Sequence, residues 1–207
     1  LFLRSLCIMG IYAGITVISA RYGDMMLAVS SILVQLMMVF SYFTDGFAYA
    51  GEAMTGKFIG RKDIDAVRST VKGVFIWSMG VAAVFMALYG ICGRQMLYAL
   101  TSDHDVVSSA MEFIPWLIPM PLVGCAAFTW DGIYVGATAS RPIRNSCIWA
   151  VSGFFIVWFV MHGIMKTAIA GNPAIAVHIL MAAFLVHLII RMTYETALYK
   201  RSILEAV

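Results

Sequence analysis

Charge is what this chain has least of. Only 12% of its 207 residues are charged, whereas 62% are hydrophobic, and the mean hydropathy is +0.89. Ordinary soluble domains are about 25% charged, so this composition excludes such a domain and predicts an integral membrane protein. The net charge of +3 gives no indication of nucleic-acid binding, because the basic residues follow the sides of the membrane.

Paired cysteines are also missing. Cys7, Cys92, Cys125 and Cys147 stand far apart, with no CxxC pair and no metal-ligand spacing. We therefore expect no disulfide and no metal site, and we interpret these cysteines as small apolar helix residues.

A signal-peptide layout is absent as well. Apolar sequence begins at Leu1, without a basic head and without a small-residue cleavage site after a short apolar core. We interpret the chain as part of a longer one.

Six apolar segments are long enough to cross a membrane, which takes about 20 residues. We expect transmembrane helices near residues 3–21, 26–55, 71–92, 112–137, 146–165 and 175–196. The second segment is longer than a bilayer requires and is expected to tilt or to project from it. Pro115, Pro119 and Pro121 predict a kinked or irregular outer half of the fourth segment. The predicted fold class is an all-α membrane protein over residues 1–207.

Lysine and arginine fall unevenly on the two sides that six alternating helices define. Three of the fourteen, Arg21, Arg94 and Lys166, lie on one side. The other eleven are Arg4, Lys57, Arg61, Lys62, Arg68, Lys72, Arg141, Arg144, Arg191, Lys200 and Arg201. The positive-inside rule makes the eleven-residue side cytoplasmic, so both chain ends are expected there. No Lys or Arg is then expected inside the helices, and residues 56–72 read as a basic cytoplasmic loop with an amphipathic turn.

Two aspartates lie inside the predicted helices. Asp45 precedes Lys57 by twelve residues and Asp131 precedes Arg141 by ten, which places both roughly 15 to 18 Å from the basic side. A carboxylate in a bilayer is costly and is normally kept for ion, proton or substrate handling. A glycine follows each aspartate, which allows a neighbouring backbone or a bound group to approach closely. Two acids at matched depth indicate a cation pathway.

Aromatic residues accompany both acids. At 100° per residue, Tyr42, Tyr49 and Glu52 share the helix face of Asp45, while Trp130 and Tyr134 lie near Asp131. Aromatic faces beside carboxylates suit organic cations, although such residues on membrane helices also serve helix packing. His178 and His187 are nine residues apart, on opposite sides of one helix, so they cannot share a metal ion, and we interpret both as packing or interface residues. The candidate substrate or ion path consists of Asp45, Asp131, Glu52, Tyr42, Tyr49, Trp130 and Tyr134.

The motifs around these acids resemble a known family. The quoted stretches are residues 1–5, Gln35, residues 45–53 with Gly56, Gly60 and Arg61, and residues 131–138. Together they resemble the C-terminal half of multidrug and toxic compound extrusion (MATE) transporters, in particular the DinF-like branch. The resemblance covers nearly the whole chain.

This resemblance implies one six-helix lobe of a twelve-helix secondary antiporter, with an N-terminal lobe as its partner. Such a protein sits in the cytoplasmic membrane and exports cationic or amphipathic compounds in exchange for protons or sodium. Asp131 matches the acid of the tenth helix, and Asp45 with Glu52 matches the Asp-Gly helix of this lobe. Residues 1–21 lack the seventh-helix glutamate of the sodium-coupled NorM-type branch, and the main proton-coupling aspartate of the DinF-like branch is in the other lobe, so the coupling ion stays open.

Three alternatives remain. A flippase of the same superfamily would move anionic lipid-linked sugars and would need Arg or Lys inside the helices. An intramembrane aspartyl protease would use two membrane aspartates as an acid and base pair, but its Tyr-Asp and Gly-x-Gly-Asp patterns do not match Phe43-Thr44-Asp45 or Thr129-Trp130-Asp131. A helical scaffold would be indifferent to Asp45→Asn and Asp131→Asn. We expect a transporter rather than an enzyme, with no cofactor other than the coupling ion, and with lipid, the second lobe and a small organic cation as partners.

Overall fold

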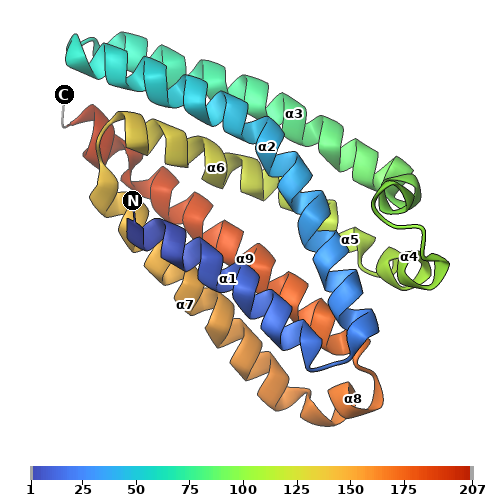
Figure 1. Cartoon of the computed structure of the whole chain (residues 1–207). Helices are drawn as coiled ribbons and strands as arrows, with labels where there is room; N and C mark the ends of the chain where they lie inside the picture. The colour runs from blue at the N-terminus through green and yellow to red at the C-terminus, as the bar shows by residue number, and fades with distance from the viewer. Residues whose placement is uncertain (1, 206–207) are drawn as a thin grey trace.

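The computed structural model describes residues 2–205, and all regular secondary structure in that range is helical (Figure 1). Leu1, which belongs to the motifs quoted above, lies outside the described residues. The helices are α1 (Phe2–Ala20), α2 (Asp24–Gly60), α3 (Ile64–Leu100), α4 (His104–Met111), α5 (Ile114–Leu117), α6 (Met120–Gly136), α7 (Ser140–Ile164), α8 (Lys166–Gly171) and α9 (Ala174–Tyr199), and α9 runs on into a π-helical turn, Lys200–Leu204.

Six of the described segments are long and apolar enough to cross a membrane: α1, α2, α3, α5 with α6, α7, and α9 with its π-helical turn. The all-α fold with six long apolar helices is therefore confirmed, and the protein is an integral membrane protein. Most helices are longer than the sequence suggested, because charged residues at their ends extend them beyond the apolar core.

The α2–α3 hairpin shows this extension most clearly. Each helix has 37 residues, or about 55 Å at 1.5 Å per residue, against a hydrocarbon core about 30 Å thick. The predicted basic loop over residues 56–72 is wrong, because only residues 61–63 interrupt the helices. Asp63 caps α3 by accepting a hydrogen bond from Ala66 N at 2.9 Å, and Val67 and Val71 are buried within the first two turns.

The proline-rich segment is broken, as predicted. Helix α5 is a single turn, and α6 begins only after Ile118 and Pro119. Proline removes a backbone donor and clashes with the preceding turn, so a continuous helix cannot form there. His178 of α9 holds this segment: Trp116 Nε1 donates to its Nδ1 at 2.9 Å, and its Nε2 lies 3.0 Å from Glu112 Oε1. His178 thus has the packing role expected for it.

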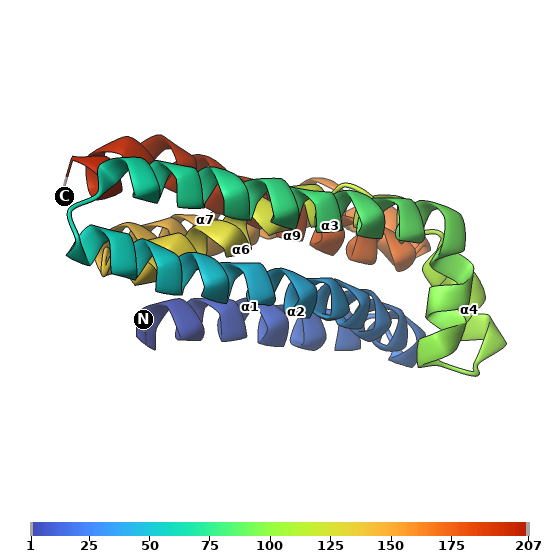
Figure 2. The same ribbon diagram turned by 90° about the horizontal axis from the view of Figure 1, so that it is seen from above.

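Helices α6 and α9 form the interior of the bundle. In the most apolar stretch of each segment, about 67% of the residues are buried for α5 with α6 and 56% for α9, against 17% to 33% for α1, α2, α3 and α7. Helix α6 packs against α2, α3 and α9, while α9 also packs against α7. Helices α2 and α3 pack against each other, and Figure 2 shows α1 on the side of the bundle away from α3. Residues on α6 are therefore enclosed by α2, α3 and α9.

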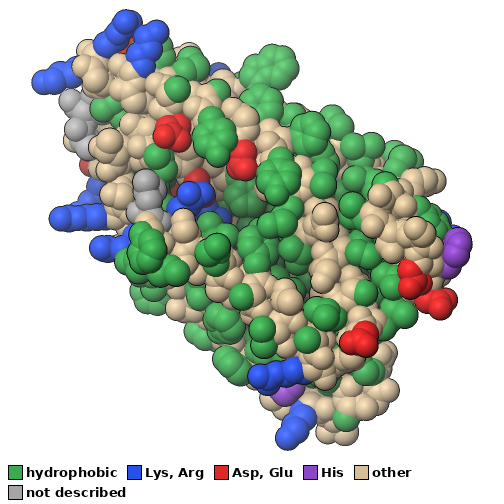
Figure 3. Space-filling model, in the orientation of Figure 1, with side chains coloured by type: hydrophobic (Ala, Val, Ile, Leu, Met, Phe, Trp, Pro, Cys, Tyr) green, Lys and Arg blue, Asp and Glu red, His purple; other side chains and the backbone are tan. Residues whose placement is uncertain are grey.

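Charge is distributed along the bundle in the way that a membrane protein requires. Figure 3 shows Lys and Arg gathered mainly at the end that holds the chain termini, with hydrophobic side chains over most of the visible face. Large apolar side chains on α3 and α7, such as Trp77, Ile91 and Phe159, are more than 60% exposed. Such outward-facing apolar side chains suit contact with lipid.

Candidate functional site

Close packing of α6 on α2 builds the floor of the site. A Cβ atom added at Gly132 would overlap the carbonyl oxygen of Ala48, and one added at Gly136 would overlap that of Glu52. Glycines four residues apart let two membrane helices approach along their backbones. Gly132 and Gly136 are therefore packing glycines, and their contact places Asp131 beside the stretch of α2 that carries Asp45 and Glu52.

A cavity of about 140 Å³ lies at this junction. Its wall carries four of the seven candidate residues, together with one arginine and apolar or small side chains. It is lined by Arg4, Asp45, Ala48, Tyr49, Glu52, Phe128, Asp131, Gly132 and Val135. In Figure 3, acidic and basic side chains meet on the visible face, toward the end that holds the chain termini. The structure thus brings Asp45, Tyr49, Glu52 and Asp131 around one polar cavity.

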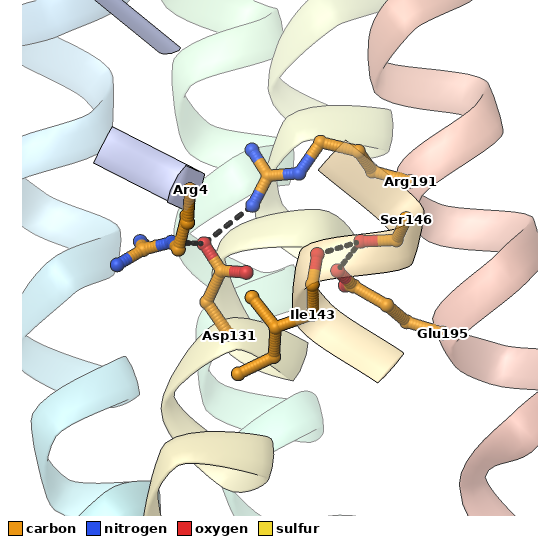
Figure 4. Close-up of polar contacts among 6 residues, drawn as sticks. All are labelled: Arg4, Asp131, Ile143, Ser146, Arg191 and Glu195. Atoms are coloured by element: carbon orange, nitrogen blue, oxygen red, sulfur yellow. Dashed lines mark hydrogen bonds and ion pairs between the residues drawn. The ribbon is translucent and has the colours of Figure 1, made fainter. Parts of the chain in front are cut away.

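Asp131 is held by two arginines from different helices (Figure 4). Its Oδ2 accepts from Arg4 Nη2 at 2.6 Å and from Arg4 Nε at 3.1 Å, and it also accepts from Arg191 Nη2. The Arg191 side chain is 1% exposed and that of Asp131 is 5% exposed, whereas Arg4 is 31% exposed. Arg191 also lies over the ring of Phe128, with its Cζ 5.8 Å from the centroid.

These ion pairs overturn two sequence interpretations. Arg191 was assigned to the cytoplasmic side, and no arginine was expected inside the helices. Arg191 is instead buried within α9, nine residues before Lys200, and forms an ion pair with Asp131. The segment was taken to end near residue 196, so Arg191 looked like a helix-end residue, but α9 continues to Tyr199.

A second buried acid lies behind Asp131. Glu195 is 0% exposed and stands four residues after Arg191 on α9. Ser146 Oγ of α7 lies 2.6 Å from Glu195 Oε1 and 2.9 Å from the carbonyl oxygen of Ile143 (Figure 4). Sequence reasoning missed Arg4, Arg191, Glu195 and Ser146. One signal for two of them was present in the sequence. Arg191 and Glu195 are four residues apart, so they lie on the same side of α9, and both precede the basic pair Lys200-Arg201.

The remaining candidates lie away from the cavity. Trp130 and Tyr134 are buried on the side of α6 that faces α9: Trp130 Nε1 donates to Thr196 Oγ1 at 2.8 Å, and Tyr134 Oη donates to the Glu195 carbonyl at 2.6 Å. Their contacts join α6 to α9. Tyr42 is 67% exposed on α2 and does not line the cavity. Within residues 2–205, no three His, Cys, Asp or Glu side chains stand together as a metal site.

Six apolar helices around buried ion pairs define an integral membrane protein with a polar site between its helices. The MatE family model matches residues 1–157. The chain is 30% identical over 201 residues to DNA damage-inducible protein F of Escherichia coli (strain K12), which covers 97% of this chain and 41% of that protein. It is 23% identical over 121 residues to Protein DETOXIFICATION 42 of Arabidopsis thaliana, which covers 58% of this chain and 24% of that protein.

The chain belongs to the MatE family, and the resemblance seen in the sequence motifs is confirmed. It spans less than half the length of either relative. No solved structure is significantly similar to it.

Proposed function

We propose that this chain is one lobe of a MATE efflux transporter that exports cationic or amphipathic compounds in exchange for protons or sodium. Membership of the family supports the transporter class and argues against an enzyme. The observation that carries the proposal is the polar cavity where α1, α2 and α6 meet, with acids on two of its walls. An acidic cavity between apolar helices is what cationic cargo requires.

The charges around the cavity favour a cation. The charge of Asp131 is engaged by Arg4 and Arg191, whereas neither Asp45 nor Glu52 has an ion pair within the described residues. Asp45 and Glu52 are half-buried on one face of α2, with the exposed Tyr49 ring between them. A carboxylate without a cation partner, next to an aromatic face, suits an organic cation. We propose that Asp45, Glu52 and Tyr49 contact the cargo first, and that Asp131 is the acid of the opposite wall of the cavity.

One observation supports a second candidate. Arg4 lines the cavity and Arg191 is buried beside it, and arginines at such positions are what a flippase for anionic lipid-linked sugars would need. Both guanidinium groups are paired with Asp131, so the unpaired charge on the wall is negative. We therefore place the flippase second. The protease alternative would need Asp131 to exchange protons with Asp45, yet the Asp131 hydrogen bonds in residues 2–205 go to two arginines.

We also propose an orientation and a partner. The end that carries residues 57–62, 141–144 and 200–201 is the cytoplasmic end, because basic residues gather there. A second lobe of the same transporter would close the cavity from the side of Arg4, Asp45 and Tyr49, where these residues are accessible.

Efflux from cells tests this function. Cells that produce the complete transporter are loaded with ethidium, and efflux is followed under a proton gradient and then under a sodium gradient. The variant Asp45→Asn combined with Glu52→Gln is expected to lower efflux about tenfold or more, since both unpaired acids are neutralised. The driving gradient identifies the coupling ion.

The matched control is Asp24→Asn, which neutralises an exposed acid in the first turn of α2, far from the cavity. It is expected to transport like wild type. Unchanged efflux in the double variant, at equal membrane levels, would refute the cation-facing role of this wall. Export of an anionic lipid analogue but not of ethidium by wild type would favour the flippase.

A further inference from the structure

The polar groups behind the cavity leave three buried atoms without a hydrogen-bond partner among the described residues. These atoms are Asp131 Oδ1, Arg191 Nε and Glu195 Oε2. They belong to side chains that are adjacent in Figure 4, with Arg191 and Glu195 extending from α9 toward Asp131 on α6. Buried polar groups are nearly always paired, since an unpaired one costs about 1 to 3 kcal/mol. Three unused groups in one cluster indicate that a second pairing scheme is available to it.

The hydrogen bonds of Ser146 indicate the protonation state of Glu195. Ser146 Oγ is within hydrogen-bond distance of two acceptor oxygens, Glu195 Oε1 and Ile143 O. A serine hydroxyl has one hydrogen, so it can serve only one of them. Both short distances are satisfied when Glu195 itself supplies the second hydrogen. The geometry around Ser146 therefore fits a Glu195 that holds a proton.

Arg191 has two acids within reach and uses one. Its Nη2 donates to Asp131, while its Nε has no hydrogen-bond partner in residues 2–205. Glu195 stands at i+4 on the same helix, the spacing at which Arg and Glu side chains meet on a helix surface. A rotation of the Arg191 side chain can thus exchange Asp131 for Glu195 without a movement of the helices.

Several charged or titratable groups face Glu195, and each helix packed around it contributes. They are Arg191 of α9, Asp131 and Tyr134 of α6, Cys147 of α7 and Arg4 of α1. Of these, Arg191 and Arg4 are cations, and both are engaged by Asp131. Glu195 is therefore a buried acid that forms no ion pair of its own with the part of the chain that the structure describes.

We propose that Glu195 is the proton-exchanging residue of this lobe, and that Arg191 couples it to the cargo site by pairing with Asp131 while Glu195 holds a proton and with Glu195 after the proton has left. The proposal rests on the proposed function. When the proton passes to bulk water, Glu195 becomes an anion and takes Arg191, and a cargo cation replaces Arg191 at Asp131. One positive charge leaves and one enters, so the net charge of the cluster is unchanged.

The scheme gives an exchange of one proton for one cation. Return of the proton to Glu195 sends Arg191 back to Asp131, which expels the cargo. Arg191 is a positioning residue in this scheme, since it acts on the cargo through Asp131.

The test measures ethidium binding to the purified complete transporter in weakly buffered detergent, at acidic and alkaline pH, together with proton release on binding. Wild type is expected to bind more tightly as the pH rises. At acidic pH, where free Glu195 holds its proton, it is expected to release about one proton per bound cation, as linkage requires. Glu195→Gln cannot lose a proton, so it is expected to bind about tenfold more weakly at alkaline pH and to release none. Glu205→Gln, an exposed acid after the π-helical turn, is the matched control.

The variant Arg191→Gln is expected to change the ethidium affinity in the opposite direction. It keeps the test valid if Glu195→Gln does not fold. Asp131 retains Arg4 in this variant. It is expected to bind ethidium about tenfold more tightly than wild type at acidic pH, with little pH dependence, because Arg191 no longer competes with the cargo for Asp131. A structural role alone would give equal or weaker binding.

The outcomes separate two failures. If wild type binds no ethidium while remaining folded, the proposed function fails for this cargo class. If wild type binds ethidium but Glu195→Gln keeps the wild-type proton release, or Arg191→Gln keeps the wild-type pH dependence, the role of the Glu195 and Arg191 pair is overturned.

Discussion

Asp45-Gly46 and Asp131-Gly132 are the same dipeptide in two opposite environments. Asp131 is buried between two arginines, and Gly132 lies against the backbone of α2. Asp45 is half-buried on a cavity wall without an ion pair in the described residues, and Gly46 has no atom within 4 Å of an added Cβ. The same dipeptide thus provides helix packing and charge balance on α6, whereas on α2 it provides an accessible acid. The comparison shows that the position of a helix in the bundle, not the motif, decides what a membrane aspartate does.

The largest difference between the two is expected in stability when the acids are neutralised. At acidic pH, where Glu195 holds its proton, Asp131→Asn leaves the 1% exposed Arg191 without a counter-charge, which should lower the free energy of unfolding by about 3 to 5 kcal/mol. Asp45→Asn should change it by no more than about 0.5 kcal/mol. Unfolding of the purified protein in mixed micelles measures both.

A double variant checks the cause of that loss. Adding Arg191→Gln to Asp131→Asn removes the orphaned charge and should recover a large part of the lost stability. Equal losses for Asp45→Asn and Asp131→Asn would break the comparison at its main point.

Substitution of the two glycines should give a smaller difference in stability than substitution of the two aspartates. Gly132→Ala places a methyl group against the Ala48 carbonyl and must push α6 from α2, at a cost of about 1 to 3 kcal/mol. Gly46→Ala meets open space and should be neutral or stabilising by up to about 1 kcal/mol, since alanine favours a helix. Thermal unfolding midpoints of the two variants, compared at equal detergent concentration, decide this. Similar midpoints would mean that α2 and α6 are not in backbone contact.

The smallest contrast concerns the aromatic residues beside each acid. Tyr49→Ala, on the cavity wall, should weaken ethidium binding about two- to fivefold, the loss of one cation–π contact, and leave stability nearly unchanged. Trp130→Phe loses its hydrogen bond to Thr196 and should reduce stability by about 1 kcal/mol without changing ethidium affinity. Binding titrations and unfolding curves for both variants test the assignment. A weaker affinity for Trp130→Phe than for Tyr49→Ala would place the cargo on the other side of α6.

Much of the fold was predictable because it depends on local composition. Long apolar runs, turn residues and prolines identified six spans and the break before α6. The helix ends at residues 56–72 were not predictable from hydropathy, since the charged ends of α2 and α3 are helical outside the apolar core. The site was only partly predictable. Asp45, Tyr49, Glu52 and Asp131 line one cavity, but Trp130 and Tyr134 lie on the side of α6 that faces α9. Because α6 is apolar on nearly all sides, its sequence does not indicate which side faces the cavity.

The sequence by itself determined the membrane class, the number of spans, the family and the presence of two acids inside helices, because each of these follows from local residue patterns. Only the tertiary structure decided which charges meet. Arg4, Asp131 and Arg191 are 127 and 60 residues apart along the chain, and they come together because Gly132 and Gly136 let α6 settle against α2 in the centre of the bundle. Ion pairing between distant residues depends on helix packing in space, and no local pattern encodes it.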